Sequence, residues 1–263
     1  MMFGLGAAIE PRTHATLKGF SPVKKHLALL AVLLAITAAP VHSLAQSTLG
    51  SKPAFIVDAP AERIPNLDKL KEQVKQYHDC TCTCGCYAHD LDLQADRAIA
   101  FLRRRALHIG PHEKLALVLD IDETTLSNYQ EMLRADFAYN VAAFDAWVNT
   151  AQAPAIPGTL RLYRESQRLG VSVFFITGRP EPQQAATERD LRAQGFQDWQ
   201  QLTLRQPSEA SEMAEVYKSH ARAQIAAQGY KIVLNVGDQW SDLKGKPEAE
   251  LSVKYPDPFY FLK

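Results

Sequence analysis

The stretch Leu-Ala-Leu-Val-Leu-Asp-Ile-Asp-Glu-Thr, residues 115–124, decides how this chain folds. Its first five residues form an unbroken apolar run, which is typical of a strand buried on both faces in a parallel sheet. Asp120 and Asp122 follow at the carboxyl end of that strand. Ligands of open α/β sheets bind beyond the carboxyl ends of the strands, so we expect chemistry at these carboxylates. An extended backbone points both to the same side, and two neighbouring like charges favour an offsetting cation.

Strand-like and helix-like segments alternate along the rest of the chain. Further apolar strands are predicted at 171–176 and 230–236 and a shorter one at 199–204, with helices at 159–169, 182–193 and 208–228. This order predicts an α/β fold with a parallel sheet and right-handed crossovers. Two amphipathic helices, at 60–77 and 90–107, predict an N-terminal helical extension (residues 46–110) before a core of residues 111–263. An aromatic-rich helix at 137–150 predicts a small cap, inserted at about residues 128–158.

The composition is that of an ordinary globular protein. Of the 263 residues 46% are hydrophobic and 22% charged, which excludes a disordered or fibrous chain. The chain has 29 Lys and Arg residues and 29 Asp and Glu residues. Because there is no excess of basic residues, the composition does not favour a nucleic acid polymer as partner. Anion binding must therefore come from local placement of charge.

Residues 1–45 have the pattern of a signal peptide. Lys24 and Lys25 precede an apolar run from 27 to 39, and the small residues of Ser43-Leu-Ala45 suit cleavage before Gln46. Thirteen residues are short for a membrane span, and a buried core helix is disfavoured because the run has no polar face. The segment before Lys24 is unusually long for the amino-terminal region of a signal peptide, so we expect that translation starts further downstream. We therefore expect an exported protein, periplasmic or secreted, with no stable membrane anchor after cleavage.

All four cysteines lie at alternating positions of one short segment: Cys80, Cys82, Cys84 and Cys86. Disulfides are the default in an exported protein, and because bridging cysteines two apart is strained, a distant pair such as Cys80 with Cys86 is favoured. A thiolate metal site is an alternative, although the spacing is tighter than in the usual pairs. A free redox role is the third interpretation.

More polar groups reach the edge of the sheet that carries the two aspartates. Thr177-Gly-Arg179 follows the strand at 171–176, Asp238 and Asp242 follow the strand at 230–236, and Lys218 lies on the intervening helix. Each feature alone is weak, since a lysine on a helix is usually solvated and Gly-Asp after a strand is often a turn. Together with the pair Asp120 and Asp122 these are four features, and three of the four directly follow apolar strands. Their joint occurrence in this order indicates a site.

These residue types suit phosphoryl transfer, which needs a nucleophile, a proton donor for the leaving oxygen and positive charge on the phosphate. Asp120 can attack phosphorus and form an aspartyl-phosphate. Asp122 can protonate the leaving alcohol and then deprotonate water. Thr177, the Gly178 amide and Lys218 can hold phosphate oxygens, and Lys218 also neutralises the paired aspartates.

Carboxylate ligands together with water favour Mg²⁺ as the cofactor. Asp238 supplies the second carboxylate that such a cation needs, and Asp242 either ligates through water or orients its neighbour. Arg179 joins Gly178 in the predicted substrate site. The predicted metal ligands are Asp120, Asp122, Asp238 and Asp242.

Five segments together carry a resemblance to a known family: Asp120-Ile-Asp-Glu-Thr124 with Leu126-Ser-Asn128, Phe175-Ile-Thr-Gly-Arg179, Tyr217-Lys218, Gly237-Asp-Gln-Trp-Ser-Asp-Leu243, and the ending Lys254-Tyr-Pro-Asp-Pro-Phe-Tyr260. From about Pro53 onward the chain resembles the haloacid dehalogenase (HAD) superfamily, and specifically its subfamily IIIB acid phosphatases. The resemblance implies a Rossmann-like three-layer sheet with a small helical cap, and phosphomonoesters, often nucleoside monophosphates, as substrates.

The resemblance also implies residue roles. Asp120 is the nucleophile, Asp122 the acid/base that lends its backbone carbonyl to Mg²⁺, Thr177 and Lys218 the phosphate holders, and Asp238 a metal ligand. Two features depart from the family: the chain lacks the cysteine that anchors lipoprotein members, and the cysteine segment is not part of the expected pattern. Neither departure touches the predicted chemistry.

The sequence therefore predicts an exported Mg²⁺-dependent acid phosphatase. Trp147 and Tyr255, with Phe259 and Tyr260, are either ordinary packing residues or a stacking surface for a nucleobase. Two other functions compete: a non-catalytic binding or storage protein on the same fold, and a metal-handling protein that uses the cysteine segment. An oligomer is compatible with all three.

Overall fold

The apolar runs of the sequence become the strands of a parallel sheet. The computed structural model describes residues 64–83 and 85–262, all within one unit, Ala59–Lys263. The helices are α1 (Leu67–Asp79), α2 (Tyr87–Ala106), α3 (Tyr129–Arg134), α4 (Val141–Thr150), α5 (Pro157–Arg168), α6 (Gln184–Ala193), α7 (Ala214–Ala227) and α8 (Trp240–Leu243), with short 3₁₀ turns η1 (Glu181–Gln183) and η2 (Pro207–Glu209). The strands are β1 (Lys114–Leu119), β2 (Ser172–Pro180), β3 (Gln201–Arg205), β4 (Tyr230–Gly237) and β5 (Leu251–Lys254).

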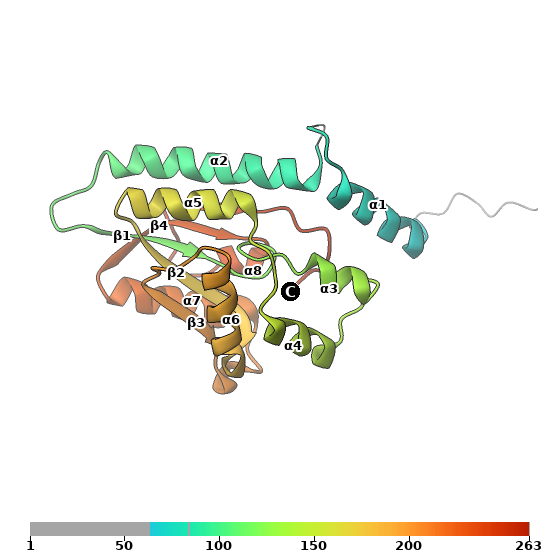
Figure 1. The fold of residues 1–263 in the computed structure, drawn as a ribbon. Coiled ribbons are helices and arrows are strands. Elements are labelled where there is room, and N and C mark those ends of the chain that lie inside the picture. Colours follow the sequence, from blue (N-terminus) through green and yellow to red (C-terminus); the bar gives the residue numbers. More distant parts are fainter. Residues whose placement is uncertain (1–63, 84, 263) are drawn as a thin grey trace, which may run out of the picture. The chain divides into compact units, whose positions relative to one another are not determined.

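Strand β1 lies at the centre of the sheet. Within the described residues the strand order is β3-β2-β1-β4-β5, and all neighbouring strands are parallel. β1 pairs with β2 through Leu119 and Phe175 and with β4 through Leu119 and Val236. The three longest apolar strands therefore end side by side, which brings their carboxyl-terminal loops to one edge (Figure 1).

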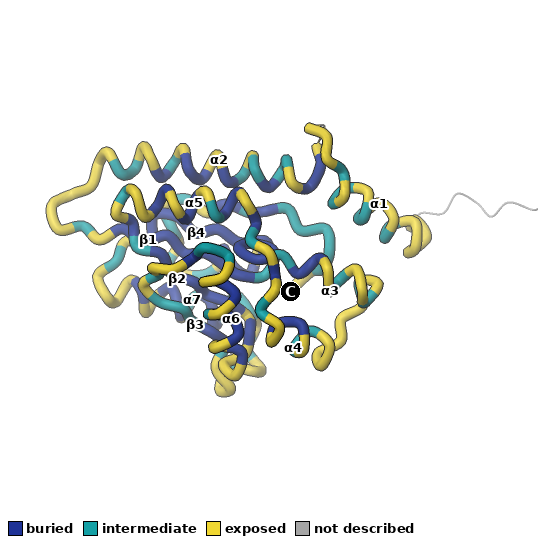
Figure 2. The backbone as a smooth tube through the Cα atoms, in the orientation of Figure 1, coloured by how far each residue is buried: buried dark blue, intermediate teal, exposed yellow. Residues whose placement is uncertain are grey.

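Helices cover both faces of the sheet, as the three-layer fold requires. Leu115, Leu117 and Leu119 pack with residues of α2, α5 and α6, whereas Ala116 and Val118 pack with residues of α7 on the other face. Alternate residues of β1 thus enter opposite cores, which explains why the run is apolar throughout. Figure 2 shows the buried faces of α2 and α5 turned toward the sheet.

Several predicted elements need correction. α1 has no buried residue, so its predicted buried stripe is wrong. The helix predicted at 208–228 begins only at Ala214, because η2 with its Gln206–Glu209 capping box occupies the preceding turn. The cap region contains two helices, α3 and α4, instead of one. β5 was not predicted, since its four residues are too few to give a pattern.

The N-terminal part of the described chain is tied together covalently. A disulfide joins Cys80, which caps the end of α1, to Cys86, which caps the start of α2. This is the pair that the sequence favoured. The predicted signal peptide and its cleavage site lie outside the described residues. In the ranges 64–83 and 85–262, we find no helix with the length and apolar character that crossing a membrane requires.

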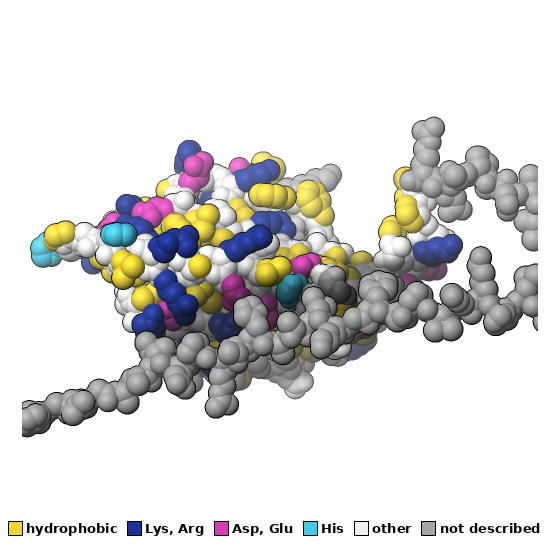
Figure 3. Space-filling view, turned by 90° about the horizontal axis from the view of Figure 1, so that it is seen from above, with side chains coloured by type: hydrophobic (Ala, Val, Ile, Leu, Met, Phe, Trp, Pro, Cys, Tyr) yellow, Lys and Arg dark blue, Asp and Glu magenta, His cyan; other side chains and the backbone are white. Residues whose placement is uncertain are grey.

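The outer face of the α2 and α5 layer carries charges of both signs. Arg161 of α5 pairs with Asp92 and Asp96 of α2 at 2.9 and 3.0 Å, and Figure 3 shows basic, acidic and apolar side chains interspersed on this face. This mixture agrees with the balanced composition.

Candidate active site

The loop after β1 separates the two aspartates. The carbonyl oxygen of Ile121 accepts hydrogen bonds from the backbone N–H groups of Thr125 and Leu126, each at 2.8 Å. Glu123 has a φ of 58°, in the left-handed region that few residues other than glycine adopt. The tight turn directs Asp120 toward Lys218 and Asp122 toward Arg179. Each carboxylate thereby acquires its own cation.

Asp120, Lys218 and Asp242 form a buried ionic group. The Lys218 ammonium lies 2.6 Å from Asp120 Oδ1 and 2.5 Å from Asp242 Oδ1, and all three residues are buried. Burial lowers the pKa of Lys218, but Asp120 and Asp242 outweigh it and hold that pKa well above its ordinary value. Burial raises the pKa of Asp120, opposed by the Lys218 ammonium. The lysine therefore stays charged beside the predicted nucleophile.

Arg179 holds Asp122 in place. Its Nη2 and Nε lie 2.8 and 3.0 Å from Asp122 Oδ1, and Asn128 Nδ2 donates to the same oxygen at 2.8 Å. Thr177 Oγ1 donates to Asp122 Oδ2 at 3.5 Å. Burial raises the pKa of Asp122, but the Arg179 guanidinium outweighs it and brings the pKa below its ordinary value.

The third acid, Asp238, is held by two neutral donors. Thr124 Oγ1 donates to its Oδ1 at 2.9 Å, and Gln239 Nε2 donates to its Oδ2 at 2.8 Å. Ligand oxygens of Asp238, Asp120 and Asp242 all lie within 4.8 Å of one another. Gly237 permits this arrangement, because a Cβ at that position would overlap the folded-back side chain of Asp242.

The structure thus brings most of the predicted catalytic and metal-binding side chains together, with two changes of partner. Arg179, predicted to bind substrate, is 2% exposed, and its guanidinium donates hydrogen bonds to Asp122 and to Thr187 Oγ1. Asp242, predicted as a metal ligand, gives one oxygen to Lys218 and accepts the backbone N–H of Gln239 at 2.8 Å with the other. These contacts let it orient Lys218, while its carboxylate still lies among the oxygens that could hold a metal ion. Gly178 stays exposed at the end of β2.

The two aromatic residues predicted to contact substrate do not face an open site. Trp147 of α4 is buried, and its indole N–H donates to Asn128 Oδ1 at 2.9 Å. Tyr255 is completely buried in the core beneath α2 and α5, and its hydroxyl accepts from Thr159 at 3.3 Å. The structure supports packing for both rings, and Tyr255 offers no face to a substrate.

Residues that the sequence analysis assigned no role complete the site. Glu123 accepts from the backbone N–H of Asn128 at 2.5 Å, which closes the loop after β1. Gln239 Nε2 donates a hydrogen bond to Asp257 Oδ2 at 2.5 Å. The signal for Glu123 and Asn128 was their place inside the first motif, and the signal for Asp257 was its place in the chain ending, residues 254–260, three residues after β5.

The charge balance of this region suits a divalent cation. Burial and repulsion from Asp242 and Asp257 raise the pKa of Asp238 to about 8, and burial raises the pKa of Asp257 to about 6. Buried carboxylate oxygens in excess over cationic side chains are the environment that a hard divalent cation offsets. The acids are Asp120, Asp122, Glu123, Asp238, Asp242 and Asp257, and the cationic side chains in contact with them are Lys218 and Arg179.

An aromatic cluster lies where α1, α3 and the chain ending meet. His78 of α1 stacks on Tyr129 of α3 with ring centroids 3.3 Å apart, and Phe259 lies 5.4 Å from Tyr129. We define the aromatic cluster as Tyr77, His78, Tyr87, Tyr129, Phe137 and Phe259.

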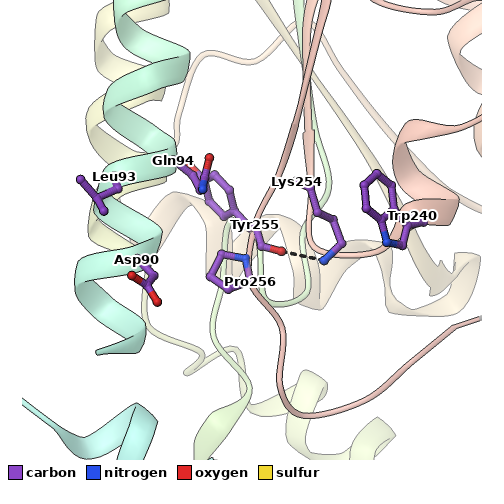
Figure 4. A pocket seen from close by; sticks show the side chains of 7 residues that line it. All are labelled: Asp90, Leu93, Gln94, Trp240, Lys254, Tyr255 and Pro256. Atoms are coloured by element: carbon purple, nitrogen blue, oxygen red, sulfur yellow. Dashed lines mark hydrogen bonds between the residues drawn. The ribbon is translucent and has the colours of Figure 1, made fainter. Parts of the chain in front are cut away.

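A separate hollow of about 330 Å³ opens between α2 and the segment that follows β5. Figure 4 shows Leu93, Gln94 and Asp90 on one side and Trp240 with Lys254 on the other. None of the strand-end acids lines it, so this hollow is distinct from the site of the chemistry.

Comparison with known proteins agrees with this architecture. Residues 41–263 match the family described as HAD superfamily, subfamily IIIB (Acid phosphatase), and the chain belongs to that family. A class C acid phosphatase from Bacillus anthracis superposes with a TM-score of 0.58 at 26% identity, covering 73% of this chain and 87% of that one. The protein is accordingly a phosphomonoester hydrolase of the HAD superfamily.

Plant proteins are among its relatives. Acid phosphatase 1 of Solanum lycopersicum is 35% identical over 215 residues, which cover 79% of this chain and 81% of the tomato protein. Vegetative storage protein 1 of Arabidopsis thaliana is 32% identical over 149 residues, which cover 55% of this chain and 54% of that protein. The chain is thus similar both to a protein named as an enzyme and to one named as a storage protein.

Proposed function

We propose that the protein is an Mg²⁺-dependent acid phosphatase that works through a phosphorylated Asp120. The observation that carries this proposal is the position of Asp120, 2.6 Å from the Lys218 ammonium and grouped with the oxygens of Asp238. A nucleophile with a phosphate-binding cation on one side and a metal-binding acid on the other has the parts that phosphoryl transfer needs.

In the first displacement an oxygen of Asp120 bonds to phosphorus as the bond to the leaving alcohol breaks. Asp122 takes up a proton at acid pH and gives it to that alcohol; because the Arg179 ion pair opposes this protonation, the transfer requires Arg179 to loosen its contact, while Asn128 still holds the carboxyl group. In the second displacement water loses a proton to Asp122 and attacks phosphorus, which breaks the bond to Asp120. Inorganic phosphate leaves, and both acids return to their starting states.

The metal ion has a defined place in this scheme. HAD phosphatases generally use a divalent cation, and the carboxylates of Asp120 and Asp238 would hold it here. When bound, Mg²⁺ neutralises charge on the phosphoryl oxygens. Lys218 and the hydroxyl of Thr177 supply the remaining positive and hydrogen-bonding contacts.

The experiment is the substitution Asp120→Asn, assayed with p-nitrophenyl phosphate with and without Mg²⁺. We expect turnover to fall by at least about 1,000-fold, since removing a nucleophile removes the pathway. Asp68→Asn, an exposed aspartate in the first turn of α1, is the matched control and should keep full activity. Mass spectrometry after acid quench should find the phosphate on Asp120. Full activity of Asp120→Asn would reject the mechanism, and activity unchanged by EDTA would reject the metal requirement.

Nucleoside monophosphates are the proposed substrate class. Phe259 and Tyr260 lie on the chain segment that borders the acids, and the aromatic cluster adjoins it. Aromatic faces of this kind can stack on a nucleobase. Turnover of AMP should exceed that of glycerol phosphate at equal concentration, and equal rates would leave no role for stacking.

A storage role is the second candidate, and the similarity to vegetative storage protein 1 favours it. The two candidates differ in activity: a storage protein that is not an enzyme releases no phosphate from any ester in a substrate panel. The intact ionic group around Lys218 supports the enzyme instead.

We propose that the protein is exported, on the signal-peptide pattern of residues 1–45. Amino-terminal sequencing of the mature protein, recovered from outside the cytoplasm, should begin at Gln46. A product that retains Lys24 and Lys25 in the cytoplasm would contradict export.

A further inference from the structure

One carboxamide joins the metal-binding edge of the sheet to the end of the chain. Gln239 follows Asp238 directly and is 4% exposed. Its Nε2 donates to Asp238 at 2.8 Å and to Asp257 at 2.5 Å, and lies 3.4 Å from the carbonyl oxygen of Tyr260. Its Oε1 accepts the backbone N–H of Leu262 at 3.1 Å. We call residues 257–262 the C-terminal tail.

The tail has no regular secondary structure of its own that would hold it in place. Asp257 accepts the backbone N–H of Phe259 at 2.8 Å, which folds the tail around Gln239. The ring of Phe259 then enters the aromatic cluster beside His78 and Tyr129. Gln239 makes three hydrogen-bond contacts with the tail, at Asp257, Tyr260 and Leu262, and Asp257 also lies close enough to Asp238 for the two acids to influence each other.

The same carboxamide sets the direction of the Asp238 carboxylate. Thr124 binds one oxygen of Asp238 and Gln239 binds the other, so both oxygens are fixed before a cation arrives. Groups that orient a ligand in this way typically contribute 10- to 100-fold to metal affinity. Gln239 therefore serves the tail and the acid at the same time.

We propose that Gln239 is a positioning residue that couples the order of the C-terminal tail to the affinity of Asp238 for a divalent cation. Binding of the cation restrains Asp238 further, and Asp238 in turn holds the Gln239 carboxamide and with it the tail. Detachment of the tail frees the carboxamide and loosens Asp238. This inference rests on the proposed metal-dependent function.

The test measures Mg²⁺ binding by isothermal titration calorimetry, without substrate. Gln239→Ala removes the side-chain hydrogen bonds of residue 239 to Asp238 and to the tail. It should weaken Mg²⁺ binding by roughly 10- to 100-fold. Gln206→Ala is the matched control, because Gln206 is the N-cap of η2 in a capping box, as Gln239 is of α8, but lies away from the acids. It should bind Mg²⁺ like the unaltered protein.

Hydrogen–deuterium exchange of residues 257–262 separates coupling from simple loss of a ligand-orienting group. Gln239→Ala should speed exchange in the tail, and Mg²⁺ should slow that exchange in the unaltered protein. Thr124→Val removes the other donor to Asp238 without touching the tail, so it should weaken Mg²⁺ binding and leave tail exchange unchanged when no metal is present.

The outcomes are distinct. If the unaltered protein binds no Mg²⁺, the proposed metal-dependent function fails. If it binds Mg²⁺ and Gln239→Ala binds equally well, or if Mg²⁺ does not slow tail exchange, the coupling fails. Should Gln239→Ala not fold, Gln239→Glu keeps the size of the side chain while replacing its N–H donors by a charge facing Asp238 and Asp257, and the same two measurements apply.

Discussion

The strand-end site and the aromatic cluster lie at neighbouring parts of the molecule but are built in opposite ways. In the site the buried charged groups are held by specific ion pairs and hydrogen bonds, as Lys218 is by Asp120 and Asp242. In the aromatic cluster, rings from α1, α2, α3 and the tail each contact several other rings, as His78 contacts Tyr129 and Phe259. A buried charge without a partner is costly, whereas one ring can replace another at moderate cost.

This difference predicts which substitutions lower catalysis and stability most strongly. Loss of a charged group in the site leaves another charge buried and uncompensated, so both catalysis and stability suffer. Loss of a ring in the cluster removes only a contact.

The largest effect is expected for Lys218→Met. The substitution keeps the length of the side chain but leaves Asp120 and Asp242 facing each other without their shared cation. Turnover should fall on the order of 1,000-fold, and the free energy of unfolding by about 3–5 kcal/mol. Steady-state kinetics and urea unfolding measure the two effects. Lys231→Met, which removes an exposed lysine on β4, should change turnover less than twofold; a comparable loss there would end the contrast.

Arg179→Lys should have the next largest effect. A lysine keeps the charge but cannot make the forked contact to Asp122, so the acid/base loses its orientation. We expect kcat to fall roughly 10- to 100-fold, with a smaller change in KM. Arg168→Lys on the surface of α5 is the control. A rise in KM with unchanged kcat would assign Arg179 to substrate binding after all.

His78→Ala tests the aromatic cluster. Loss of the stack on Tyr129 should lower the free energy of unfolding by about 1 kcal/mol, while turnover of p-nitrophenyl phosphate stays within about twofold. Differential scanning calorimetry and the same assay measure both. His108→Ala, at an exposed position after α2, should change neither quantity. If His78→Ala abolished turnover, the cluster would belong to the catalytic machinery.

The smallest effect concerns surface pairs outside both regions. The backbone N–H of Gly110 and the Arg105 guanidinium lower the pKa of Glu113 to about 2, and Arg168 and Arg103 do the same for Glu165. Because the folded-state pKa is depressed, the stabilisation is present above the unfolded pKa of about 4.5 and is lost as pH falls toward about 2. Tm measured between pH 6 and pH 2 should fall less steeply for a Glu113→Gln/Glu165→Gln variant. Parallel curves would contradict these pKa values.

Much of the fold was readable from sequence because its signals are local. The strand at 115–119, the buried residues of α2 and the end of β4 just before Asp238 follow from periodicity and apolar runs, whereas β2 runs through Thr177 to Pro180, beyond its predicted end at 176. The predicted start of α7 was wrong because the hydrogen bonds of the η2 capping box replace the first turns of the expected helix. Likewise α1 has helical periodicity but no buried side chain, since periodicity alone does not show how much of a helix its neighbours cover.

Local sequence patterns were enough to predict the parallel sheet and the edge where the acids and the lysine meet, because the carboxyl ends of parallel strands lie at the same edge of a sheet. The three-dimensional arrangement was needed to show that Arg179 pairs with Asp122, that Tyr255 is buried, and that Gln239 forms hydrogen bonds with the tail. Those contacts join residues far apart in the chain, and their geometry depends on side-chain directions at the sheet edge that no local pattern encodes.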